Sequence, residues 1–330
     1  MKRRQLLKYT GVLGFMASLS SFKSFAGISN NTTIINSAGG YINFRLGELD
    51  MLVITDGHIL ISPAQPIIAP GIPKEKVKSA MVDNFMFSDF VDAAINILVI
   101  RKEKRIILID TGSGTAIGNQ AGRFLENLKS AGIQPEEVTD IFITHLHIDH
   151  IGGILDSTGG HVFKNAKYYL SQLEYDFWMS KSPDFSKSKN TGSNTGSVVL
   201  AQSIIEAIKV KTELFTFGET LFDCIKPELA AGHTPGHPVF TIFSEDQEMR
   251  HIVDTVHTSL LLSHPEWGTE WDIDFEKSVA TRLRILEEQA KGKRLTMSCH
   301  LPWPGLGYIV KKDSGFDWVP MSFSTPQLYG

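Results

Sequence analysis

Residues 141–153, IFITHLHIDHIGG, constrain the fold of this chain more than any other segment, because three histidines and an aspartate directly follow a run of β-forming residues. Alternate residues of an extended segment point the same way, so His145 and His147 can reach one point as the chain leaves a sheet. Asp149 and His150 then turn toward a second point. Imidazole and carboxylate are ligands that Zn²⁺ and similar cations prefer. The segment therefore predicts a metal site at a strand end, and the alternative is a solvated, His-rich turn.

The sequence HLHIDH resembles the HxHxDH signature of the metallo-β-lactamase superfamily, and further motifs follow in family order within residues 41–330. His233 in AAGHTPGH, Asp254 in HIVDTVH and His300 in SCHLPWPG stand where the family's dinuclear hydrolases have their third histidine, bridging aspartate and last histidine. Asp110 in ILIDTGSG matches the acid that orients ligands. The resemblance implies an α/β fold, the αββα sandwich, in which two mixed sheets pack face to face with helices outside.

Two divalent metal ions per chain are implied by the resemblance, because seven ligands exceed one four-coordinate site. The family pattern assigns three histidines to one ion: His145, His147 and His233. It assigns an aspartate and two histidines to the other: Asp149, His150 and His300. Asp254 would bridge the ions through its two oxygens. Zinc is expected, with manganese, cobalt and iron as alternatives.

A hydroxide that bridges the two ions is the expected nucleophile, since bound metal lowers the pKa of water toward ~7. Asp254 or Asp149 would carry the proton. Within the superfamily the chain resembles the methyl parathion hydrolases and related lactonases, through EYDFWMS at residues 174–180 and the later HLPWPGLGYI. Small esters, lactones and phosphotriesters are the implied substrates.

Four positions are expected to contact substrate. Trp178 matches an aromatic wall of the leaving-group pocket, and Trp271 lies near another pocket position. Ile117 stands where the organophosphate enzymes have phenylalanine, and His257 where they have leucine and acyl-homoserine lactonases have tyrosine. Since an imidazole N–H at residue 257 can donate to a lactone oxygen, His257 is a candidate catalytic residue. We therefore expect opening of lactones or cleavage of aryl esters, with weaker phosphotriester hydrolysis.

The alternatives are an organophosphate hydrolase of the methyl parathion type, a thioester hydrolase like glyoxalase II, and a metal-binding module without catalysis. True β-lactamases lack a bridging aspartate at the place of Asp254. Glyoxalase II shares all seven ligands, but its basic binding segment near the C-terminus is replaced here by LPWPGLG.

The order of secondary structure was also predicted from the sequence. Residues 97–100 and 106–109 are short apolar runs typical of buried strands. Residues 41–61 alternate and contain Asp56-Gly57, which predicts a hairpin turn there. Residues 27–40 are polar and predict an irregular lead-in to a single hydrolase domain at 41–330. Residues 183–197 are rich in Ser, Gly, Asn and Lys and predict a mobile loop.

Residues 1–26 predict an export signal of the twin-arginine type. Arg3 and Arg4 form the arginine pair, an apolar stretch follows, and Ser-Phe-Ala at 24–26 is a small-x-small cleavage pattern. The apolar stretch is shorter than the roughly 20 residues that cross a bilayer, so no stable membrane anchor is expected. The mature chain is therefore expected in the periplasm or outside the cell. An uncleaved basic terminus is the alternative.

The charge and the cysteine content of the chain limit its possible partners and disulfide bonds. The net charge is −4 with no basic run in the body of the chain, which argues against nucleic acid. Cys224 and Cys299 are the two cysteines, so no disulfide framework supports the fold. Whether they pair is open from the sequence, and Cys299 is expected to be a small buried residue rather than a ligand. A homodimer also stays open.

Overall fold

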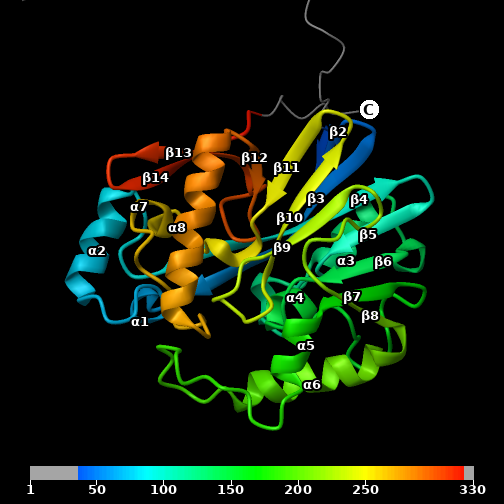
Figure 1. The fold of residues 1–330 in the computed structure, drawn as a ribbon, viewed down its shortest axis with the longest axis horizontal. Coiled ribbons are helices and arrows are strands. Elements are labelled where there is room, and N and C mark those ends of the chain that lie inside the picture. Colours follow the sequence, from blue (N-terminus) through cyan, green and yellow to red (C-terminus); the bar gives the residue numbers. More distant parts are fainter. Residues whose placement is uncertain (1–35, 323–330) are drawn as a thin grey trace, which may run out of the picture. The chain divides into compact units, whose positions relative to one another are not determined.

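The computed structural model describes residues 36–322, and two β-sheets form the centre of this part of the chain (Figure 1). The first sheet has eight strands in sequence order: β1 (Asn36–Ala38), β2 (Tyr41–Leu46), β3 (Leu49–Ile61), β4 (Val91–Lys102), β5 (Arg105–Ile109), β6 (Asp140–Ile143), β7 (Lys167–Ser171) and β8 (Thr212–Phe215). Strands β1 to β5 pair antiparallel, and β5 to β8 pair parallel. The sheet is therefore mixed, as predicted.

The second sheet has six strands in the order β14-β13-β12-β11-β10-β9. Their bounds are β9 (Ile225–Leu229), β10 (Pro238–Ser244), β11 (Gln247–His251), β12 (Leu295–Met297), β13 (Leu306–Lys312) and β14 (Gly315–Pro320). Only the pair β11 and β12 is parallel, and the other pairs are antiparallel. This sheet is mixed too.

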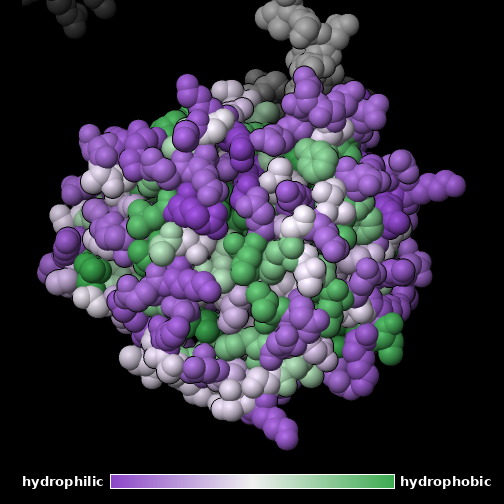
Figure 2. All heavy atoms as spheres, in the orientation of Figure 1, coloured by the Kyte–Doolittle hydropathy of each residue, from purple (hydrophilic) through white to green (hydrophobic). Residues whose placement is uncertain are grey.

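Helices cover the outer faces of both sheets (Figure 1). They are α1 (Ala64–Ile67), α2 (Lys74–Asp83), α3 (Phe124–Ser130), α4 (Ile148–Ile151), α5 (Gln172–Trp178), α6 (Thr195–Ile208), α7 (Leu260–Ser263) and α8 (Phe275–Gly292). The helix α8 contacts β13, whereas α3 contacts β3 and α5 contacts β7. In space-filling view, polar residues cover much of the face drawn in Figure 2, and apolar residues gather across its middle.

Three apolar layers hold the sandwich together, and β4 shows how one strand serves two of them. Ile97 and Val99 belong to the core between the first sheet and its helices. Leu98 and Ile100 belong to the core between the two sheets. Successive side chains of a strand point to opposite faces, so a continuous apolar run is required where both faces are covered. A third core lies between the second sheet and helices that include α8. The predicted αββα sandwich is confirmed.

The hairpin turn predicted at Asp56-Gly57 is wrong. Strand β3 continues through these residues with a β-bulge, and the chain instead turns at Gly47-Glu48. Gly57 has φ 122°, and an added Cβ would lie 2.2 Å from the carbonyl oxygen of Gln120. The buried Asp56 carboxylate accepts hydrogen bonds from the backbone N–H groups of Ser113 and Phe124. Asp56 thus anchors the loop after β5, and Gly57 lies in the bulge. In the sequence, the Asp-Gly pair has the same composition as a hairpin turn, although its role here is tertiary.

The start of the chain is described only in part. Residues 36–38 belong to the lead-in of residues 27–40 that was predicted to be irregular. They form strand β1 instead, because their backbone pairs with β2. The signal predicted for residues 1–26 lies outside the described residues and stays a prediction. Among residues 36–322, none of the helices has the length and apolar character that a membrane span requires.

Candidate metal centre

The predicted ligands meet because parallel strands end at the same edge of a sheet. In the first sheet, Asp110 follows β5 and His145 follows its parallel neighbour β6. In the second sheet, Asp254 follows β11 in a 3₁₀ turn and His300 follows β12, which is parallel to β11. His233 follows β9. All seven predicted ligands are brought together in two groups, each with its ligand atoms within 4.8 Å of one another.

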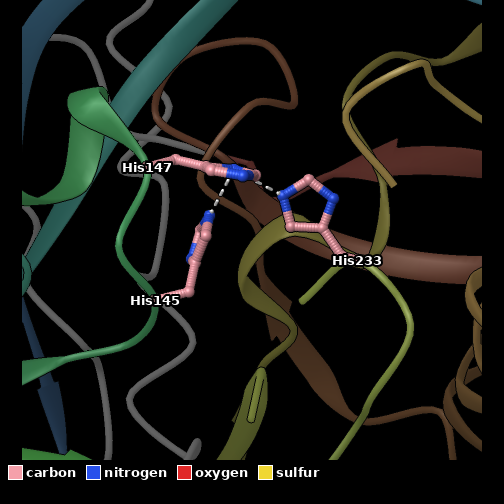
Figure 3. A group of neighbouring side chains, drawn as sticks. All are labelled: His145, His147 and His233. Atoms are coloured by element: carbon pink, nitrogen blue, oxygen red, sulfur yellow. Dashed lines mark hydrogen bonds between the residues drawn. The ribbon is translucent and has the colours of Figure 1, made fainter. Parts of the chain in front are cut away.

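The first group consists of His145, His147 and His233, whose rings point toward one another (Figure 3). The Nδ1 atom of His147 lies 3.1 Å from Nε2 of His145 and 3.1 Å from Nε2 of His233. Burial lowers the pKa of His145 well below its ordinary value and that of His147 to about 3. The rings of His145 and His147 are therefore neutral at pH 7, which is the form that binds metal.

Asp254 joins this group to the second one, which also contains Asp149, His150 and His300. Its Oδ2 atom lies 3.0 Å from Nε2 of His300 and 3.3 Å from Nε2 of His150. The same oxygen lies 3.6 Å from Nε2 of His145. A single oxygen therefore faces both groups, whereas the sequence predicted that the two oxygens would span them.

The charges of this centre fit bound cations. Although burial raises the pKa of Asp254, the surrounding His300, His150 and His145 hold it well below its usual range, so the carboxylate is ionised. The buried atoms His150 Nε2 and Asp254 Oδ1 have no hydrogen-bond partner within residues 36–322. Buried polar atoms are costly without a partner, and a cation would compensate both. The donor set of imidazoles and carboxylates suits two divalent ions.

Buried groups fix the ring orientation of His145 and His150, the ligands that follow strand β6. His150 donates from Nδ1 to Asp110 Oδ2 at 2.7 Å, and the backbone N–H of Thr144 donates to Asp110 Oδ1 at 2.8 Å. The Thr144 hydroxyl donates to Asp110 and lies 2.9 Å from Nδ1 of His145. Asp110 has φ 70°, a strained conformation that functional sites retain. Since each Nδ1 is engaged in this way, Nε2 is the ring nitrogen that each histidine turns toward the centre.

Other groups fix the ring orientation of His233 and His300, the ligand histidines in the second half of the chain. Asp272 lies 2.9 Å from His233 Nδ1 and contacts Arg282, and the carbonyl of Ala94 accepts from His300 Nδ1 at 2.8 Å. His237 supports a ligand through its backbone: the Nε2 atom of His237 accepts from the backbone N–H of Asp254 at 3.2 Å.

Sequence reasoning missed two supporting residues. His251 is buried, and its Nδ1 accepts from the backbone N–H of Val253, which has φ 50°. Glu174 is buried and accepts four hydrogen bonds. The donors are the N–H groups of Leu146, Trp178 (indole) and Gly236 and the hydroxyl of Thr234. The only signal for Glu174 was its place in EYDFWMS, four residues before Trp178.

The two cysteines are buried and free. Cys299 lies with Asp110 and His150 in a further group of nearby ligand atoms. Burial raises the pKa of the Cys299 thiol well above its ordinary value, so it stays protonated, unlike a thiolate ligand. This agrees with the prediction that Cys299 is a buried packing residue.

A cavity of about 590 Å³ opens onto the centre, and the predicted substrate contacts line it: Ile117, Trp178, His257 and Trp271. Residues from the 183–197 loop form one wall. The loop is attached at Lys187, whose carbonyl accepts from the N–H of Phe275, and at Ser188, whose hydroxyl donates to the carbonyl of Glu270. Mobility of the rest of the loop stays a prediction.

His257 lies at the junction of the cavity and the metal centre. Its Nε2 is 3.4 Å from Asp254 Oδ2, and its ring stacks on His300 with centroids 5.2 Å apart. Burial lowers its pKa to about 4, so the ring is neutral at pH 7. With His233 and Asp254 it forms a further group that could hold metal, so His257 is a candidate ligand besides the seven predicted ones.

The family model described as the metallo-beta-lactamase superfamily matches residues 91–262, which include most of these ligands. The chain belongs to the metallo-β-lactamase superfamily. It is a metal-dependent hydrolase, and the two groups of histidines and aspartates indicate two metal ions.

Solved structures agree with this assignment. AidC, a dizinc quorum-quenching lactonase in complex with the product N-hexanoyl-L-homoserine, is 36% identical, with a TM-score of 0.83 over 87% of this chain and 99% of that chain. AbOPH, a hydrolase of the beta-lactamase superfamily, is 30% identical, with a TM-score of 0.78 over 88% and 100%. A probable metal-dependent hydrolase from Staphylococcus aureus is 18% identical, with a TM-score of 0.66 over 85% and 100%, and shares the fold. No curated protein sequence matches the chain.

Proposed function

We propose that this hydrolase opens N-acyl homoserine lactones, using two zinc ions held by the predicted ligands. The proposal is supported by the 36% identity to a dizinc lactonase over 87% of the chain. In the proposed assignment, His145, His147 and His233 hold one ion, and Asp254 faces both. The second ion is held by Asp149, His150 and His300. Bound zinc would polarise the substrate carbonyl and lower the pKa of water toward ~7.

The observation that carries the substrate class is the charge of the cavity wall. Among residues 36–322, those that line the cavity include no lysine or arginine. Anionic substrates are usually recognised by cationic side chains, so this cavity suits a neutral molecule. A lactone is neutral, whereas a phosphodiester or a glutathione thioester carries negative charge. The wall therefore weighs against the glyoxalase II alternative.

The chain's own residues supply orientation and proton handling. The neutral His257 ring can donate one N–H to a lactone oxygen, and its position beside His300 places that donor over the centre. Trp178 is fixed by its indole bond to Glu174 and forms an apolar side of the cavity. Asp254 or Asp149 is the proposed proton carrier, because both residues line the cavity at the centre. Donors pre-positioned in this way stabilise charge that develops on the substrate.

Phosphotriester hydrolysis is the second candidate. A phosphotriester is also neutral, and the aromatic walls at Trp178 and Trp271 can contact an aryl leaving group. We expect it to be the weaker activity, since Ile117 and the polar 183–197 loop offer less aromatic contact than the organophosphate enzymes do. A resemblance to methyl parathion hydrolase beyond the superfamily stays part of this proposal.

The test is a hydrolysis screen of the purified, zinc-loaded protein. Substrates are N-hexanoyl homoserine lactone, an aryl ester, methyl parathion and a glutathione thioester, each measured as kcat/KM, with zinc content measured in parallel. We expect about two zinc ions per chain and the highest kcat/KM on the lactone. A preference for methyl parathion would favour the second candidate. Full zinc content with no hydrolysis of any substrate would favour a non-catalytic module.

A further inference from the structure

Glu270 lines the cavity beside Trp271, whose ring centroid lies 5.5 Å from that of His257. Its backbone is held on two sides. The N–H of Glu270 donates to the carbonyl of Ile67 at 2.9 Å, and its carbonyl accepts from the Ser188 hydroxyl at 3.2 Å. The position of Glu270 in the cavity wall therefore does not depend on its side chain.

The Glu270 carboxyl is an uncommitted acceptor. Within residues 36–322 it makes no hydrogen bond or ion pair, and burial alone raises its pKa. The side-chain amide oxygens of the neighbouring wall are already engaged, since Asn190 Oδ1 accepts from the N–H of Gly192 and Asn194 Oδ1 accepts from Asn190. Among the described residues that line the cavity, Glu270 is the one carboxylate-bearing residue outside the metal centre, and its carboxylate has no partner in residues 36–322 that would compete with a donor on the substrate.

We propose that Glu270 is a specificity residue that accepts the amide N–H of an N-acyl amino-lactone. This inference rests on the proposed lactonase function and deepens it. An N-acyl amino-lactone is neutral, and its amide beside the ring carries one strong donor. A simple lactone or an O-acyl lactone has no such donor, so it would leave the Glu270 carboxylate unpaired. Sites that hydrogen-bond a substrate group discriminate against analogues that lack it, because their own polar group is then left without a partner.

The test compares two substrates that differ at one atom. They are N-hexanoyl homoserine lactone and α-hexanoyloxy-γ-butyrolactone, in which an ester oxygen replaces the amide N–H. We expect the unaltered enzyme to prefer the amide by roughly ten- to a hundredfold in kcat/KM, mainly through KM, as for one hydrogen bond to a charged acceptor. In Glu270→Gln, which keeps a weaker acceptor of the same size, the preference should fall to a few-fold. In Glu270→Ala it should fall to about one.

Glu266→Ala is the matched control, because Glu266 is exposed, lies in the same segment and does not line the cavity. It should leave the preference unchanged. Because each variant is judged by a ratio of two substrates, a general loss of activity or metal cancels, and zinc content is measured for every variant. An unchanged ratio in Glu270→Ala would overturn the role of Glu270 while leaving lactone hydrolysis intact. If neither lactone is hydrolysed by the unaltered enzyme, the lactonase function itself is wrong.

Discussion

The metal centre forms the floor of the cavity. There, the second ring nitrogen of a ligand histidine is held by a buried group, as Asp110 holds His150 and Asp272 holds His233. In the outer wall, formed by residues 183–197, the polar side chains bond mainly to residues two to four positions away. The floor is determined from several directions across the fold, whereas the wall depends on local contacts and on its attachment near Lys187 and Ser188. We infer that the floor determines which reaction is catalysed and that the cavity walls determine which substrate is bound.

The largest effect is expected from Asp254→Asn on the floor. A neutral amide is a poor ligand for two cations, and Oδ2 of Asp254 is the atom that faces both groups. We expect kcat to fall on the order of 10²–10³-fold, with KM little changed. Steady-state kinetics with zinc content measures this. Unchanged turnover at full zinc content would refute the bridging assignment.

A smaller effect is expected from Glu174→Gln, which alters support for the floor without removing a ligand. One Gln nitrogen would face donors such as the N–H of Gly236 or Leu146, so the loops that carry His145, His147 and His233 would loosen. Zinc affinity should fall roughly tenfold, the range for groups that orient ligands. Competition with a chelator measures this affinity.

Glu213→Gln is the control for this experiment, because Glu213 is exposed on β8. It should leave zinc affinity unchanged. Equal zinc affinity in Glu174→Gln and the unaltered protein would show that the floor is less dependent on its supports than the hydrogen bonds suggest.

The smallest effect is expected at the boundary between floor and wall, from His257→Leu. Losing one donated hydrogen bond should lower kcat/KM for the lactone about tenfold, while methyl parathion hydrolysis holds or rises. His257 also belongs to a group that could bind metal, so zinc content separates the two roles. Loss of zinc together with both activities would place His257 among the floor ligands instead.

Much of the floor was predictable because its spacing is local. His145, His147, Asp149 and His150 lie within six residues, and the direction of their side chains follows from the backbone of a strand and a turn. The continuous apolar runs of residues 97–100 and 106–109 likewise require strands with both faces covered, and the structure confirms both. The resemblance in motif order added the distant His233, Asp254 and His300, which the structure brings to the same centre.

The remaining features were decided only by the tertiary structure. Glu174 accepts from Thr234 and Gly236, which are 60 and 62 residues away, and no local pattern encodes such partners. The Asp56-Gly57 pair has the composition of a turn, but packing against residues 113–124 makes it a bulge. The alternation of side chains along a strand and the metal-binding character of its residues depend on only a few neighbouring positions. The sequence itself therefore determines both. Which carboxylates lose water and find partners depends on how the sheets and loops pack, and only the folded chain decides that.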